Sequence, residues 1–267
     1  MRLWTLGSGS RGNAVLVESG GSRVLIDAGF TPRVLARRLA ALEIPCESIE
    51  AVIITHEHQD HVLGACAAAA RWGWALYATQ GTAAAHPPLA DAGARTFAAG
   101  ATIELRAMTV QSVPTPHDAA EPVALVVTGR ESGTRAGIAY DLGHASAAVR
   151  AALGDLALLV LEANHDEGML RAGPYPPSVR ERIAGSHGHL SNRAAAALAA
   201  DCAHRGLAHV VLAHLSESCN DPALATSTVR SALARTAFRG QVAAASQRTP
   251  AGPFIAGSGP AQLTLPL

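Results

Sequence analysis

The sequence predicts an α/β protein, a four-layer αβ/βα sandwich in which two β-sheets pack face to face between outer layers of helices. Two observations support this class. Each half of the chain begins with strand-like segments and continues with helices and apolar strands in alternation. In addition, 49% of the 267 residues are apolar and only 16% are charged, which allows a large buried core without disulfide bonds.

The first part of the chain is expected to open with short strands. They cover residues 3–6, 14–18 and 23–27, the last two joined by a glycine turn. Thr31 and Pro32 fit the N-cap and the first position of a helix. The uninterrupted β-rich run 51–55 is typical of a strand buried on both faces. A histidine-rich loop and an alanine-rich helix follow it.

Further along, strands are expected first, and helices alternating with strands afterwards. The strand segments are 74–78, 102–113, 123–128 and 135–140. After them come helices 144–153, 177–185, 191–205 and 222–236 and strands 156–161 and 208–213. Because no linker or repeat divides the chain, we expect one domain over residues 1–267, with 246–267 as a loose tail or an edge strand.

The charge balance limits the partners of the protein. All 21 basic side chains are arginines, and 21 acidic residues balance them. A protein that holds nucleic acid through a broad electrostatic surface is usually basic, so any such contact should be local. No segment has the pattern of a signal peptide or a membrane span, and no Cys-x-x-Cys pair occurs. We therefore expect a cytoplasmic protein with reduced thiols and no membrane contact, of unknown oligomeric state.

A glycine-rich segment, Gly7-Ser8-Gly9-Ser10-Arg11-Gly12, matches the pattern of dinucleotide-binding turns, with Asp27 at the spacing of a ribose-binding acid. Such a turn must open a helix whose N-terminus holds the pyrophosphate. The residues that follow, 13–18, are β-rich and end at a glycine pair. No nucleotide cofactor is therefore expected.

The clearest functional signal is the run Thr55-His56-Glu57-His58-Gln59-Asp60-His61, directly after a buried strand. Two imidazoles two residues apart on an extended segment project to one side, so His56 and His58 can bind one cation. Asp60 and His61, at the turn into the next helix, can reach a second cation. A purely structural histidine cluster would leave several titratable groups crowded without partners. The run therefore predicts metal binding.

Three further candidate ligands, His117, Asp141 and His214, each stand at the end of a predicted strand. Asp141 is the natural candidate for a carboxylate that bridges two cations. Taken alone, His117 also fits a turn and His214 a helix cap. Their repeated position at the carboxyl ends of strands favours one shared site with two metal ions.

These motifs resemble the signature of the metallo-β-lactamase fold superfamily, His-x-His-x-Asp-His after a buried strand. The resemblance covers nearly the whole chain and implies the same four-layer fold and two divalent ions, Zn²⁺ or Mn²⁺. Asp27 matches an aspartate that supports the ligands. The resemblance also divides the seven ligands between the ions. It implies that one ion is held by His56, His58 and His117, the other by Asp60, His61 and His214, and that Asp141 bridges them.

Within the superfamily, the chain is most similar to the bacterial YycJ/VicX-type proteins. The similarity lies in Ser8-Gly9-Ser10-Arg11-Gly12-Asn13, Ile26-Asp27-Ala28-Gly29, Glu162-Ala163-Asn164-His165-Asp166, Gly173-Pro174-Tyr175-Pro176 and Gly188-His189-Leu190-Ser191-Asn192. It implies a metal-dependent phosphodiesterase or nuclease with 5′ to 3′ exonuclease activity on DNA. The side chains that it places beside the ligands or the substrate are Ser10, Asn13, Asn164 and His165.

A second resemblance is to the tRNA 3′-processing endonucleases of this fold, whose motifs Glu162, His189 and His214 match in the same order. The expected reaction is attack of a metal-bound hydroxide on a phosphodiester, with Asp60 as ligand and orienting group. His189, polarised by Glu162, would protonate the leaving oxygen. A plainer role for His189 is to cap the helix that begins near Ser191.

Other functions remain open. The same ligands would serve a thioesterase, a lactonase or a β-lactamase-type hydrolase, although such chemistry gives Glu162 and His189 no clear task. A non-catalytic regulatory protein would keep the metals for structure, and Cys219 is an alternative zinc ligand. Local positive charge is available from two groups of arginines, of which the first equally fits a solvated helix face: Arg33, Arg37 and Arg38, and Arg171, Arg180, Arg182 and Arg193.

Overall fold

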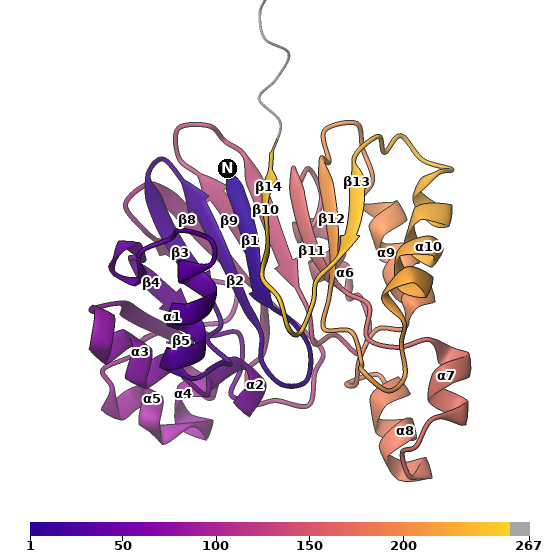
Figure 1. Ribbon diagram of the computed structural model, residues 1–267, viewed down its shortest axis with the longest axis horizontal. Helices are drawn as coiled ribbons and strands as arrows, with labels where there is room; N and C mark the ends of the chain where they lie inside the picture. The colour runs from indigo at the N-terminus through magenta and orange to yellow at the C-terminus, as the bar shows by residue number, and fades with distance from the viewer. Residues whose placement is uncertain (257–267) are drawn as a thin grey trace, which may run out of the picture.

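Two seven-stranded β-sheets lie at the centre of the protein in the computed structural model, which describes residues 1–256 (Figure 1). The first sheet contains β1 (Arg2–Gly7), β2 (Ala14–Ser19), β3 (Ser22–Ile26), β4 (Ala51–Ile53), β5 (Ala75–Thr79), β6 (Arg95–Phe97) and β14 (Ala251–Ile255). The second contains β7 (Thr102–Glu104), β8 (Met108–Pro114), β9 (Val123–Gly129), β10 (Arg135–Ala139), β11 (Leu158–Glu162), β12 (His209–Ala213) and β13 (Gln241–Ala244).

Both sheets have the same internal order. Neighbouring strands run β14-β1-β2-β3-β4-β5-β6 in the first sheet and β13-β12-β11-β10-β9-β8-β7 in the second. In each sheet the early strands pair antiparallel, whereas β3 to β6 and β10 to β13 pair parallel. The parallel strands of a sheet end at one edge, and this edge carries the site described below.

Helices cover the outer face of each sheet (Figure 1). Those packed on the first sheet are α1 (Pro32–Ala40), α3 (Ala65–Trp72), α4 (Gln80–Ala85) and α5 (Pro87–Asp91), and those on the second are α6 (Ala147–Ala152), α9 (Asn192–Asp201) and α10 (Pro222–Leu233). Shorter elements lie in the connections: η1 (Cys46–Ser48), α2 (Gln59–Val62), α7 (Glu167–Ala172) and α8 (Pro177–Ala184). The predicted four-layer fold is confirmed. Among the described residues, no helix combines the length and the apolarity that a bilayer span requires.

Alternating strand residues fill both sides of each sheet. In β2, Val15 packs between the sheets and Leu16 packs against the helices. In β11, Val160 likewise lies between the sheets, whereas Leu161 contacts the helix layer. Burial of each such side chain contributes about 1.5–3 kcal/mol, so both faces of the central strands stabilise the sandwich. This two-sided burial explains the continuous apolar runs in the sequence.

Several elements differ from the predicted ones. The predicted strand 102–113 is a hairpin, in which β7 pairs antiparallel with β8. Its turn, Leu105 to Ala107, contains none of the glycine, proline or asparagine residues that mark turns. Helices α4, α5 and α7 were not predicted, because six, five and six residues are too few to show a helical period.

The C-terminal segment forms an edge strand where the structure describes it. β14 pairs antiparallel with β1, and Phe254 lies opposite Leu3. Residues 246–267 were predicted to form a loose tail or an edge strand, and the edge strand is confirmed for Ala251–Ile255. The remaining part of that predicted tail, 257–267, lies outside the described residues.

The arginines of α1 do not share one solvated face. Arg33 and Arg37 are exposed, but Arg38 is buried. The Arg38 guanidinium donates hydrogen bonds to the carbonyl oxygens of Leu6 at 2.7 Å and Gln247 at 2.9 Å. Arg38 therefore joins α1 to β1 and to the C-terminal segment, and the prediction of a solvated or nucleic-acid-binding role is wrong for this residue.

Replacing Arg38 by alanine is expected to lower the free energy of unfolding by about 2–4 kcal/mol. The change leaves two buried carbonyl oxygens without their charged donor and removes the guanidinium from its position 3.9 Å from the ring centre of Phe30. Urea unfolding measures the loss. The exposed Arg37→Ala variant of the same helix should change stability by less than about 0.5 kcal/mol, and equal losses in the two variants would contradict the prediction.

Candidate metal centre

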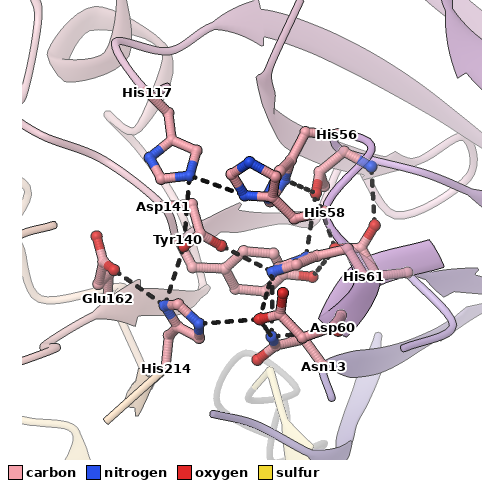
Figure 2. A network of polar contacts seen from close by, with 12 residues as sticks. Asn13, His56, His58, Asp60, His61, His117, Tyr140, Asp141, Glu162 and His214 are labelled. Atoms are coloured by element: carbon pink, nitrogen blue, oxygen red, sulfur yellow. Dashed lines mark hydrogen bonds and ion pairs between the residues drawn. The ribbon is translucent and has the colours of Figure 1, made fainter. Parts of the chain in front are cut away.

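The candidate ligands meet where strands of both sheets end. Asp27 follows β3, the histidine run 56–61 follows β4, Asp141 follows β10 and His214 follows β12, while Glu162 is the last residue of β11. Because parallel strands of one sheet end at the same edge, side chains far apart in the sequence converge here. Figure 2 shows them gathered in one network of polar contacts.

Three histidines form the first cluster. His56 Nε2 lies 3.1 Å from His58 Nδ1, and His117 Nε2 lies 3.4 Å from the same nitrogen. Nitrogens bound at ~2.0–2.1 Å around a tetrahedral ion are about 3.3–3.4 Å apart, so this spacing fits three ligands of one cation. His117 Nδ1 donates to the Gly188 carbonyl oxygen at 3.1 Å, which leaves its Nε2 lone pair for a metal.

The second cluster contains one carboxylate and two histidines. Asp60 Oδ2 lies 3.3 Å from both His61 Nε2 and His214 Nε2. The other ring nitrogen of each histidine faces a buried carboxylate: His61 Nδ1 lies 2.8 Å from Asp27 Oδ2, and His214 Nδ1 lies 3.1 Å from Glu162 Oε1. Both Nδ1 atoms can therefore donate hydrogen bonds, and both Nε2 atoms turn toward Asp60 as metal ligands do.

Asp141 lies between the two clusters. Its Oδ2 is buried and lies 2.9 Å from His61 Nε2, and yet it receives no hydrogen bond from any residue of the described range 1–256. Its Oδ1 is 3.0 Å from His214 Nδ1 and 4.0 Å from His117 Nε2. A buried carboxylate oxygen without a donor is costly unless a cation neutralises it. The position and the unsatisfied oxygen of Asp141 both fit a carboxylate shared by divalent metal ions.

The electrostatics of the site also fit a cation. Burial acts to raise the pKa of Asp60 and of Asp141, but His61 and His214 hold both values well below the ordinary range. Both carboxylates therefore stay ionised. Burial lowers the pKa of His56 well below its usual value, which keeps this imidazole neutral. Burial acts to lower the pKa of His61 and of His214, but Asp141 and neighbouring carboxylates raise both well above the usual value. Neutral imidazole and ionised carboxylate are the forms that bind metal, so a cation at the second cluster must displace a proton from each of these two histidines.

Three site residues adopt a strained backbone. Among the described residues five non-glycine positions have positive φ, and three of them are Asp27 at 59°, Asp141 at 57° and His214 at 53°. A left-handed conformation costs on the order of 1–3 kcal/mol for such residues. Each of the three stands directly after a strand or one residue further on, where the chain turns its side chain toward the site. No sequence signal marks this strain, since aspartate and histidine are common after strands for other reasons.

A buried tyrosine supports the second cluster. Tyr140 Oη donates a hydrogen bond to Asp27 Oδ2 at 2.6 Å. The backbone NH and the hydroxyl of Thr55 donate to the two oxygens of Asp27, each at 2.8 Å. Asp27 is thus held on several sides while it orients His61. Tyr140 was not predicted as a site residue, because a tyrosine at the end of a strand looks like an ordinary core residue.

The Tyr140→Phe variant is expected to bind metal about tenfold more weakly, with stability lowered by about 1 kcal/mol. The change removes one hydrogen bond from Asp27 and so loosens the orientation of His61. A competition titration with a chromophoric zinc chelator measures the affinity. Tyr77→Phe is the matched control, because within the described part of the chain the Tyr77 hydroxyl hydrogen-bonds only to the exposed Arg95 side chain. Equal affinities in the two variants would exclude the supporting role of Tyr140.

Glu162 connects the second cluster to His189. Its carboxylate is fully buried, and Oε1 lies 2.7 Å from His189 Nδ1 and 3.1 Å from His214 Nδ1. Oε2 accepts hydrogen bonds from the backbone NH of Leu142 at 2.8 Å and of Leu190 at 3.1 Å. Burial would raise the pKa of Glu162, but His189 and His214 lower it to about 2. One carboxylate therefore orients two histidines and two loops; its contact with His214 was not predicted.

His189 is not the cap of the helix that follows it. Ser191 is the N-cap of α9, and its hydroxyl accepts from the Ala194 NH at 3.2 Å. Because His189 Nδ1 faces Glu162, its Nε2 remains for a substrate, and 18% of the side chain is exposed. Burial acts to lower the pKa of His189, but Glu162 and Asp141 raise it to about 9. The imidazole is therefore protonated at neutral pH and can donate a proton.

The residues predicted to lie beside the ligands or the substrate are divided between two cavities and the hydrogen-bond network around the ligands. Ser10 and Asn164 line a cavity of about 250 Å³ together with five of the candidate ligands, namely His58, Asp60, His117, Asp141 and His214. Asn13 Nδ2 lies 3.1 Å from Asp60 Oδ2, and Asn164 Nδ2 donates to the His214 carbonyl oxygen at 2.9 Å. The structure does not bring His165 into this cavity; it lines a neighbouring one. Among the described residues, none of the clusters with metal-ligand geometry includes Cys219.

The fold and this donor set define a class of protein. Residues 22–215 match the family model described as a β-lactamase superfamily domain. The chain belongs to the metallo-β-lactamase fold superfamily, and the predicted family is confirmed.

The chain is similar to two curated relatives over most of their length. Exodeoxyribonuclease YycJ of Bacillus anthracis is 30% identical over 237 residues, which cover 87% of this chain and 89% of that protein. Exodeoxyribonuclease WalJ of Streptococcus pneumoniae is 32% identical over 248 residues, or 86% of this chain and 87% of that one. Among solved structures, the metallo-β-lactamase fold protein YhfI of Bacillus subtilis has a TM-score of 0.69 at 17% identity and covers 94% of this chain and 99% of its own.

Proposed function

We propose that the protein is a metal-dependent phosphodiesterase that degrades DNA as a 5′ to 3′ exonuclease. The observation that carries the proposal is the pair of buried Glu162 and partly exposed His189 beside the candidate metal ligands. A phosphodiester leaves an alkoxide that needs a proton, and His189 is positioned and charged to supply one. The names of the two curated relatives, both exodeoxyribonucleases, support DNA as the substrate.

The proposed cofactors are two divalent ions, Zn²⁺ or Mn²⁺. The first is assigned to the cluster of His56, His58 and His117 and the second to the cluster of Asp60, His61 and His214, with Asp141 shared between them. Imidazole ligands suit zinc, and the carboxylates Asp60 and Asp141 also suit manganese. When bound, such ions lower the pKa of water and polarise a phosphoryl oxygen.

The protein's own groups have separate tasks in this mechanism. Asp60, which stays ionised, can accept a hydrogen bond from the attacking water and hold it in line with the phosphorus. Asn13 Nδ2 positions the Asp60 carboxylate at 3.1 Å. Glu162 holds His189 so that Nε2 faces the leaving oxygen, and His189 gives its proton there. Asp60, Glu162 and His189 are thus the proposed catalytic groups.

Substrate binding is proposed to be local and weak away from the metals. The zero net charge of the chain offers no broad basic surface. Arg182 lines the metal cavity, but it pairs with Asp118 at 2.9 Å, which reduces its pull on phosphate. We therefore expect modest processivity.

We also propose that residues 1–267 act as one domain in the cytoplasm.

A direct test uses purified protein supplied with Mn²⁺ or Zn²⁺. The substrates are 5′- and 3′-end-labelled single- and double-stranded DNA and RNA, a small aryl phosphodiester, a thioester and a lactone. The expected result is stepwise release of nucleotides from the 5′ end of DNA. The Asp60→Asn variant, purified in the same way, exposes contaminating nucleases. Cleavage of the thioester or the lactone alone would overturn the proposal.

Turnover is expected to fall on the alkaline side of a pH profile. His189 donates a proton only as the imidazolium, and Glu162 and Asp141, acting against burial, raise its pKa to about 9. Below that pH the acid is present, and above it kcat should drop about tenfold per pH unit. Initial rates measured between about pH 6 and 10.5 test this. Turnover that does not fall on the alkaline side of this range would contradict the assignment.

A further inference from the structure

A second cavity lies next to the metal cavity, on the other side of α8. The residues of α8 that line it are Pro177, Arg180, Glu181 and Ala184. The residues of α8 that line the metal cavity are Val179, Arg182 and Ile183. Offsets of three and four within each set are those of two separate faces of one helix. α8 is therefore a wall between two cavities.

His189 is where the two cavities meet. Its side chain lines both of them, and Glu162 holds it there through Nδ1. The second cavity measures about 710 Å³, against about 250 Å³ for the metal cavity. Residues of α7, α8 and the start of α9 line it, and α7 and α8 lie together beyond the ends of the sheets (Figure 1). A volume of this size is typical of small-molecule and cofactor pockets.

The lining of the second cavity combines apolar walls with cations. Leu170 and Leu190 contribute apolar surface. Arg171 and Arg180 also line it, together with the carboxylates of Glu167 and Glu181. Arg180 donates a hydrogen bond to the Arg171 carbonyl oxygen, and neither arginine forms an ion pair with another described residue. Nucleobases stack on apolar side chains and on guanidinium planes, and the same guanidinium groups attract phosphate. Ser191 also lines the cavity, and its hydroxyl donates to Glu167 Oε1 at 3.1 Å, an oxygen that Arg193 contacts as well at 3.1 Å.

We propose that this cavity binds the nucleoside on the leaving side of the cleaved phosphodiester. The proposal rests on the nuclease function proposed above. Water adds to the phosphorus, the bond from phosphorus to the 3′ oxygen breaks, and His189 gives that oxygen its proton. The nucleoside that carries this oxygen must then lie beyond His189 as seen from the metal ligands, where the second cavity opens. In a 5′ to 3′ exonuclease it is the 5′-terminal nucleoside, released with a free 3′ hydroxyl.

Two variants of α9 test the proposal. Ala194 is exposed and lines the cavity, whereas Ala197 is exposed three residues later and does not line it. Ala194→Phe should fill part of the cavity, and Ala197→Phe is the matched control. The substrates are a DNA oligonucleotide, the same oligonucleotide with an abasic 5′-terminal residue, and a small aryl phosphodiester.

For the unchanged protein and for Ala197→Phe, the abasic terminus should lower kcat/KM about tenfold, because the base no longer stacks in the cavity. For Ala194→Phe, kcat/KM on normal DNA should fall about tenfold, and the abasic terminus should cause no further loss. Hydrolysis of the aryl phosphodiester should be the same for all three proteins. A tenfold abasic penalty that persists in Ala194→Phe, or equal losses in both variants, would overturn the proposal.

A binding measurement separates this proposal from the nuclease function itself. Calorimetric titration of the metal-free protein with a deoxynucleoside 5′-monophosphate should give saturable binding that Ala197→Phe keeps and Ala194→Phe loses. Absence of such binding overturns the subsite, whatever the protein hydrolyses. Binding without hydrolysis of any phosphodiester would support the subsite and reject the proposed function. Thermal unfolding checks that Ala194→Phe is folded, and Ala184→Trp on α8 fills the same cavity if it is not.

Discussion

The His189→Asn variant is expected to retain its metal ions and to lose about 10²- to 10⁴-fold in kcat on DNA, the range that a general acid supplies. Asparagine can still hydrogen-bond Glu162, so the buried carboxylate keeps a partner, but it has no proton to give the leaving oxygen. Metal content by elemental analysis and single-turnover rates on end-labelled DNA measure the two properties separately. On an aryl phosphodiester with an acidic leaving group, the kcat of His189→Asn should fall far less, because that leaving oxygen needs no proton.

His187 provides the control for this experiment. It lies two residues before His189 in the same loop, is exposed, and contacts Ser186 Oγ at 3.2 Å without lining the metal cavity. His187→Asn should keep full turnover. If His189→Asn turned over DNA as fast as His187→Asn, His189 would have no part in the mechanism. If it lost metal together with activity, its task would be to position ligands.

The Asp141→Asn variant is expected to lose at least half of its bound metal and more than about 100-fold in kcat/KM. Asp141 is the carboxylate that lies against both clusters, and its buried Oδ2 has no hydrogen-bond donor. An amide in its place carries no charge for the cations and presents two NH donors to histidines that must act as ligands. Elemental analysis and rates at saturating Mn²⁺ or Zn²⁺ report the two losses.

Asp155 is the matched control for Asp141. Both residues adopt a left-handed backbone, with φ of 57° at Asp141 and 55° at Asp155, and asparagine tolerates this conformation well. Asp155 is exposed and remote from the clusters. Asp155→Asn should therefore bind metal and turn over DNA normally. Full metal content in Asp141→Asn would show that this carboxylate does not bridge the ions.

Local patterns carried most of the information about the site. Two-residue spacing in an extended segment places His56 and His58 on one side, and the ends of parallel strands bring Asp141 and His214 to the same edge. Both rules depend on residues close together in the chain and on the direction of strands. For that reason the ligands could be predicted from the sequence, and the structure brings them together in overlapping groups with metal-ligand spacing, two of which contain Asp141.

Elements without a local signal were the ones that were missed. The hairpin at 102–114 turns through Leu105 to Ala107, where nothing in the sequence interrupts the β-rich pattern. Arg38 looks like its exposed neighbour Arg37 along the helix. Its burial depends on carbonyl oxygens of Leu6 and Gln247, which only the packed chain brings within reach.

The chain's local order, then, specifies four layers and a metal-binding edge, because hydrophobic period and strand direction act over a few residues. The packing of distant segments decides which side chains support the ligands at that edge and which cavities lie beside them. Tyr140 supports Asp27 across 113 residues, Glu162 serves both His189 and His214, and α8 divides the metal cavity from the second one. Such contacts arise from the relative placement of distant segments, which is decided when the two sheets and their helices bury their apolar faces together.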